Sequence, residues 1–192
     1  MSKSRLEAFT DAVIAIIMTI LVLDLKSPDG ASVADLWEMR HSFSAYFVSF
    51  VTLAVYWSNH HHLFQVAKVV SGKILWWNTL LLLCLSLFPF TTAWVGKFVG
   101  STTTELTYGA LMLATNVVWV FLSRALVQKH GKDSPLSNSL AGSKKPAFTI
   151  GIIIAGLIVG WFWASAVRFL CLASLIPWVV PNRRIEHEMQ AK

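Results

Sequence analysis

The sequence has few charged residues and only two cysteines, and these shortages exclude several classes of protein. Of its 192 residues, 14% are Asp, Glu, Lys or Arg, 55% are hydrophobic, and the mean hydropathy is +0.60. This composition is too apolar for a water-soluble domain of this length. A helix needs roughly 20 apolar residues to cross ~30 Å of hydrocarbon, and several segments meet that requirement. The sequence therefore predicts an integral membrane protein.

The residues that enzymes use are also missing at workable spacings. The chain contains no HExxH, no GxSxG and no phosphate-binding glycine loop, and it has no acidic pair inside its later helices. Cys84 and Cys171 each lie in an apolar segment, where a thiol behaves as a small hydrophobic group. We therefore expect no enzyme activity, no disulfide, no metal site and no cofactor.

Six hydrophobic helices with short connections fit the chain, which predicts an all-α polytopic integral membrane protein with residues 1–192 as a single domain. The helices are expected over about residues 6–25, 33–67, 74–95, 106–127, 147–164 and 167–180. Pro89 is expected to kink the third helix. Gly151, Gly156 and Gly160 indicate either close helix contacts or lipid-facing packing in the fifth.

Lys and Arg are divided unequally between the two sides of this arrangement. Four lie on one side, at Lys26, Arg40, Lys97 and Arg168. The other twelve lie on the side of both termini: Lys3, Arg5, Lys68, Lys73, Arg124, Lys129, Lys132, Lys144, Lys145, Arg183, Arg184 and Lys192. Because cytoplasmic loops carry an excess of Lys and Arg, both termini are predicted to be cytoplasmic. This division accounts for the formal charge of +6 without a nucleic-acid partner.

The first helix is two-sided. At about 100° per residue, Ile16, Thr19 and Leu23 fall within about 60° of one another and form one stripe. Glu7 and Asp11 form a second stripe on nearly the opposite face. The charges at the start of this helix, including those of Arg5, are expected to stay away from the first stripe and to fix the rotation of the helix. The alternatives are a Thr19 hydroxyl bonded to its own helix and lipid or core contacts for Ile16 and Leu23.

Polar residues of the second and third helices are predicted at the same end of the bundle as Asp11. An unpaired charge near hydrocarbon is costly, so this carboxylate needs donors unless the positive end of its own helix suffices. The candidate donors are Asn59, His60, His61, Trp77 and Asn78. Consecutive residues such as His60 to His62 cannot close on one metal ion from a single helix, so contacts between helices are expected there instead.

The pattern R-x-x-x-F-T-D, formed by Arg5, Phe9, Thr10 and Asp11, resembles the RxxxFSD signature that opens the first helix in the transmembrane protein 175 potassium-channel family. Thr10 stands in place of the usual serine and keeps the hydroxyl group. The stretch YWSNHHHLF at residues 56–64 is similar to the aromatic and paired histidines of that family's second helix. The resemblance covers essentially the whole chain.

This resemblance implies a homotetrameric potassium channel in the plasma membrane of a prokaryote. The implied partners are further copies of the chain, the lipid bilayer and K⁺ as the permeant ion. The first helix would line the pore, without a TVGYG-type carbonyl filter, and selectivity over Na⁺ would be modest. The family's hydrophobic constriction falls on Ile16, its hydroxyl layer on Thr19 and a further apolar layer on Leu23. A secondary transporter and a non-conducting membrane scaffold are the alternatives.

Overall fold

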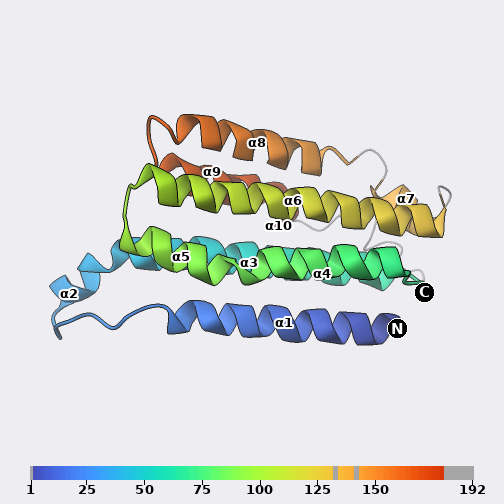
Figure 1. Cartoon of the computed structure of the whole chain (residues 1–192), viewed down its shortest axis with the longest axis horizontal. Helices are drawn as coiled ribbons and strands as arrows, with labels where there is room; N and C mark the ends of the chain where they lie inside the picture. The colour runs from blue at the N-terminus through green and yellow to red at the C-terminus, as the bar shows by residue number, and fades with distance from the viewer. Residues whose placement is uncertain (1, 132–133, 141–142, 180–192) are drawn as a thin grey trace.

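The structure, a computed structural model, is a bundle of helices and describes residues 2–131, 134–140 and 143–179. The helices are α1 (Lys3–Leu23), α2 (Val33–Glu38), α3 (Arg40–Val66), α4 (Gly72–Ser86), α5 (Phe88–Lys97), α6 (Thr102–His130), α7 (Pro135–Leu140), α8 (Lys145–Val159), α9 (Ala166–Ser174) and α10 (Ile176–Val179). The long helices lie roughly parallel to one axis, and the chain reverses direction between them (Figure 1).

These helices make six passes along the bundle, formed by α1, α3, α4 with α5, α6, α8, and α9 with α10. Three runs, Lys3–Leu23, Gly72–Lys97 and Thr102–His130, are long and apolar enough to cross a membrane. α3 is also long, at 27 residues, but it is not among these three runs. The predicted all-α class is confirmed, and short α2, ahead of α3, accounts for the length of the second predicted helix.

The third pass breaks where the sequence predicted a kink. α4 ends at Ser86 and α5 begins at Phe88, so Pro89 lies in the first turn of α5, where its missing N–H costs little. The Phe88 carbonyl at the break accepts hydrogen bonds from Thr91 Oγ1 at 3.1 Å and from Thr92 Oγ1 at 2.6 Å. Because its polar groups find partners inside the protein, this break is compatible with a position within a membrane.

One end of the bundle is basic. The N-terminus of α1, the α3–α4 connection, the end of α6 and the start of α8 all meet there (Figure 1). These segments carry Lys3, Arg5, Lys68, Lys73, Arg124, Lys129, Lys144 and Lys145. Lys132, Arg183, Arg184 and Lys192 lie outside the described residues. We call this end the basic end; that it faces the cytoplasm stays a prediction.

Arg168 corrects the charge assignment from the sequence. The sequence analysis counted it among the charges of one side of the membrane, but it lies inside α9 and is only 3% exposed. Its Nε donates a hydrogen bond to Glu105 Oε2 of α6 at 3.0 Å and lies 2.8 Å from Oε1 of the same carboxylate. Glu105 has no exposed surface. A buried ion pair therefore joins the first turn of α6 to α9 near the end opposite the basic one.

Glycines bring the backbones of α6, α8 and α9 close together. A Cβ atom on Gly109 would lie 2.7 Å from Val167 Cγ1, and one on Gly160 would lie 2.5 Å from Val167 Cγ2. A Cβ atom on Gly156 would lie 3.2 Å from Leu170 Cβ of α9, whereas one on Gly151 would have nothing within 4 Å. Of the two alternatives for the fifth predicted helix, close helix contacts hold at Gly156 and Gly160, and Gly151 is exposed, in agreement with lipid-facing packing.

Candidate functional site

α1 packs one face against the bundle and leaves the other uncovered. The packed face consists of Leu6, Thr10, Ile14, Ile17 and Leu21. Ile16, Thr19 and Leu23 all lie on the uncovered face, with Ile16 58% and Leu23 79% exposed. Only 28% of the most apolar window of α1 is buried, against 44% for α6. We call this surface the free face of α1.

Two polar side chains, Thr19 and Arg5, lie on the free face of α1. Thr19 Oγ1 donates to Ile16 O at 2.7 Å, the intrahelical bond considered as an alternative above. Donation uses only the hydroxyl proton, so the oxygen lone pairs of Thr19 stay available to a cation. Arg5 is also exposed, and it precedes Ile16 by about three helical turns. The predicted separation of Arg5 from the Ile16 stripe is therefore wrong, whereas Glu7 and Asp11 are half-buried away from it.

Asp11 is held by a residue that the sequence analysis did not assign to it. Trp57 Nε1 of α3 donates to Asp11 Oδ1 at 3.0 Å. Its indole ring stacks on His61, one turn further along α3, at a centroid distance of 6.1 Å. The donor lies on one of the two predicted helices, but it is not one of the five predicted residues. Trp57 resembles an interfacial tryptophan in the sequence, which hid this contact.

Thr10 anchors a buried hydrogen-bond network across three helices. Asn78 Nδ2 of α4 donates to Thr10 Oγ1 at 2.8 Å, and Asn78 Oδ1 lies 2.8 Å from His60 Nε2 of α3. Since the amide oxygen is an acceptor, His60 carries its proton on Nε2. All three side chains are buried, and His60 also stacks on Phe64 at 4.3 Å. The hydroxyl of the R-x-x-x-F-T-D pattern therefore ties α1 to α3 and α4.

The variant Asn78→Leu is expected to destabilise the protein by about 1–3 kcal/mol, because it leaves the polar atoms of Thr10 and His60 buried without partners. Thermal unfolding of purified protein in detergent, followed by circular dichroism, measures this loss. The matched control is Thr79→Val, at an exposed position whose hydroxyl bonds only to Leu75 O. Equal melting temperatures for the two variants would show that the network does not stabilise the bundle.

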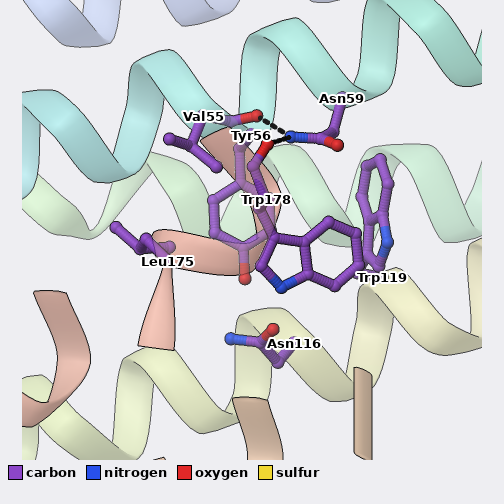
Figure 2. A pocket seen from close by; sticks show the side chains of 7 residues that line it. All are labelled: Val55, Tyr56, Asn59, Asn116, Trp119, Leu175 and Trp178. Atoms are coloured by element: carbon purple, nitrogen blue, oxygen red, sulfur yellow. Dashed lines mark hydrogen bonds between the residues drawn. The ribbon is translucent and has the colours of Figure 1, made fainter. Parts of the chain in front are cut away.

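Asn59 supports the last pass of the bundle instead of Asp11. Its Nδ2 donates to Val55 O at 2.8 Å and to Trp178 O of α10 at 3.2 Å (Figure 2). The seven residues drawn in Figure 2 line a cavity of about 10 Å³, which is the lower limit for one water molecule. Asn59 therefore contributes to the contact between α3 and α10.

The remaining candidates bond elsewhere. His61 Nε2 lies 2.6 Å from Gln65 Nε2 on its own helix. Trp77 stacks on Phe121 of α6, with ring centroids 4.8 Å apart, while Phe9 is 55% exposed on α1. Across the described residues, no group of three or more His, Cys, Asp or Glu side chains gathers as metal ligands would.

Antiparallel apolar passes, with polar side chains paired between them, define a polytopic helical membrane protein. Within this class, the chain belongs to the TMEM175 family of potassium channels. The family model described as endosomal/lysosomal potassium channel TMEM175 matches residues 5–89, from α1 to the break at Pro89. A potassium channel of Chryseobacterium sp. (strain P1-3) is 39% identical over 191 residues, which cover 99% of both chains.

Relatives with lower sequence identity also match this chain, and the share of their own length that is covered differs. The endosomal/lysosomal proton channel TMEM175 of Bos taurus is 32% identical over 207 residues, covering 99% of this chain and 41% of the bovine protein. The crystal structure of a lysosomal potassium-selective channel TMEM175 homolog from Chamaesiphon minutus superposes with a TM-score of 0.79 at 25% identity. That match covers 92% of this chain and 96% of the other, so the whole bundle is shared.

Proposed function

We propose that this chain forms a homotetrameric channel that conducts K⁺ across the plasma membrane of a prokaryote. The observation that carries the proposal is the free face of α1, where Ile16, Thr19 and Leu23 form an apolar stripe with one hydroxyl layer that the bundle does not cover. Four copies of α1 around a central axis would bury this face and line a path. The names of the bacterial relatives support K⁺ as the permeant ion.

Ile16 forms the narrowest ring in this proposal. Four apolar side chains exclude water when close together and, slightly further apart, force a cation to shed part of its hydration shell. K⁺ gives up water more readily than Na⁺, so the ring favours K⁺. Thr19 oxygens one turn further along replace some of the lost water, and Leu23 adds a second apolar layer. The preference is modest, because no ring of backbone carbonyls replaces the shell.

The hydrogen bonds that α3 and α4 make to α1 determine which residues of α1 face the proposed ion path. The Trp57–Asp11 bond and the Thr10–Asn78 bond both hold α1 from the side opposite the free face. A rotation of α1 by one residue position, about 100°, would remove Ile16 from the axis. These bonds therefore position the conducting face and need no contact with the ion.

Ion flux into liposomes that contain the purified full chain tests the proposal, with empty liposomes as the control. We expect K⁺ flux faster than Na⁺ flux, and native mass spectrometry of the same preparation should show four chains. Saturable flux that depends on a counter-ion would instead indicate a transporter, and absence of flux a scaffold. Proton flux without K⁺ flux would contradict K⁺ as the permeant ion.

A further inference from the structure

Arg5 lies on the same line along α1 as the apolar stripe of the free face. Arg5 and Ile16 are separated by 11 positions in one unbroken helix, so at about 100° per residue they point within about 20° of each other. Phe9 and Ala12 lie between them on the same line, and both are exposed, Phe9 to 55%. The free face of α1 therefore continues from Leu23 to the basic end, where it ends at Arg5.

The Arg5 guanidinium carries a charge that no described residue compensates. The side chain is exposed, and within the part of the chain that the structure describes it makes no hydrogen bond or ion pair. The two carboxylates of α1 have other partners, since Glu7 lies 3.8 Å from Lys3 Nζ and Asp11 accepts from Trp57 Nε1 at 3.0 Å. Both carboxylates are half-buried away from the free face. A positive charge therefore stands on this face at the basic end (Figure 1).

We propose that four Arg5 side chains form a cationic ring at the mouth of the ion path on the basic end. This inference rests on the homotetrameric channel proposed above, and it identifies the residue that limits how fast K⁺ enters from that end. The ring lies about 16.5 Å from the Ile16 layer along α1, roughly twice the Debye length of about 8 Å at physiological ionic strength. It therefore acts on ion entry and leaves the preference for K⁺ over Na⁺ to Ile16.

A cationic ring gathers anions, but the path beyond it offers them no hydrogen-bond donor. The side chains of Phe9, Ala12 and Ile16 are apolar, and the Thr19 hydroxyl donates its proton to Ile16 O at 2.7 Å, so only its oxygen lone pairs remain. Anions therefore stop at the mouth, whereas K⁺ passes after it overcomes the repulsion. Four unit charges about 10 Å from an entering cation lower its local concentration about threefold at about 0.1 M salt and only slightly at about 1 M.

Single-channel recording of the full chain in planar bilayers, with KCl at about 0.1 M and at about 1 M on both sides, tests the ring. Arg5→Gln should raise the K⁺ current about threefold at the lower concentration, in the polarity that drives K⁺ in from the basic end, and leave it nearly unchanged at the higher one. Arg5→Lys keeps the charge and should conduct as the unmodified chain does. The preference for K⁺ over Na⁺ should be the same in all three.

Lys3→Gln is the matched control, because Lys3 lies at the same end of α1 but points about 160° away from Arg5 and already pairs with Glu7. It should leave the current unchanged at both salt concentrations.

Ala8→Glu decides the matter if Arg5→Gln does not fold. Ala8 is exposed three positions after Arg5, so a glutamate there pairs with the guanidinium and should raise the current in the same salt-dependent way. The ring alone is overturned if K⁺ currents are present and the folded variants match Lys3→Gln, or if the current rises equally at both salt concentrations. No K⁺ current from the unmodified chain would overturn the proposed channel and the ring together.

Discussion

Replacing Arg168 with methionine is expected to lower the free energy of unfolding by about 3–5 kcal/mol. The Glu105 carboxylate has no exposed surface, and the Arg168 guanidinium now lies 2.8 Å from its Oε1. The variant removes this guanidinium and leaves the carboxylate buried without it. Methionine keeps an unbranched apolar chain in place of the arginine, so the loss reports the uncompensated charge more than a cavity. Thermal unfolding of the purified chain in detergent measures it.

Two further variants isolate the pair. Combining Arg168→Met with Glu105→Leu removes both charges and should recover most of the stability lost in the single variant. Arg40→Met, at an exposed arginine whose side chain bonds to Trp37 O, should change the free energy of unfolding by no more than about 0.5 kcal/mol. If Arg168→Met is as stable as Arg40→Met, the ion pair does not hold α9 to α6.

The variant Ile16→Asn is expected to remove most of the preference for K⁺ over Na⁺ and to raise cation flux several-fold. Asparagine has a similar size but carries an amide, which hydrates the narrow apolar ring and lets ions pass with more of their own water. Single-channel recording, or K⁺ and Na⁺ flux into liposomes, measures both quantities. If permeation and preference both stay unchanged, Ile16 is not the constriction.

Val22→Asn is the matched control for this effect. Val22 is 49% exposed on the same helix, but it points about 120° away from Ile16. The same apolar-to-amide change there should leave the K⁺/Na⁺ preference intact. An equal loss of preference in both variants would indicate a general disturbance of α1, and native mass spectrometry of each variant shows whether four chains still assemble.

Apolar length and the positions of Lys and Arg were sufficient to predict the six passes, because membrane spans must satisfy both constraints at once. Pro89 marked one break, since proline cannot continue the hydrogen bonding of a helix. The break at Met39 has no such marker. Helical periodicity also placed Ile16, Thr19 and Leu23 together, and all three lie on the free face.

Contacts between distant residues were harder to predict. Glu105 and Arg168 are far apart in the sequence, and each resembles an ordinary charge near a helix end. A usable signal was present in the apolar run around Arg168, because an arginine within such a run must find a partner. The donor to Asp11 could not be chosen from the sequence, since it depends on how far each side chain of α3 reaches across the gap to α1.

The close packing at Gly109 and Gly160 has a consequence for biogenesis. α8 has 15 residues and α9 has 9, and each is shorter than the roughly 20 residues that a span requires. Both lie against α6 where a Cβ atom on Gly109 would collide with Val167. We therefore expect α8 and α9 to be stable in the bilayer only when they are packed against α6. α6 precedes both helices in the chain, so the order of synthesis agrees with this expectation.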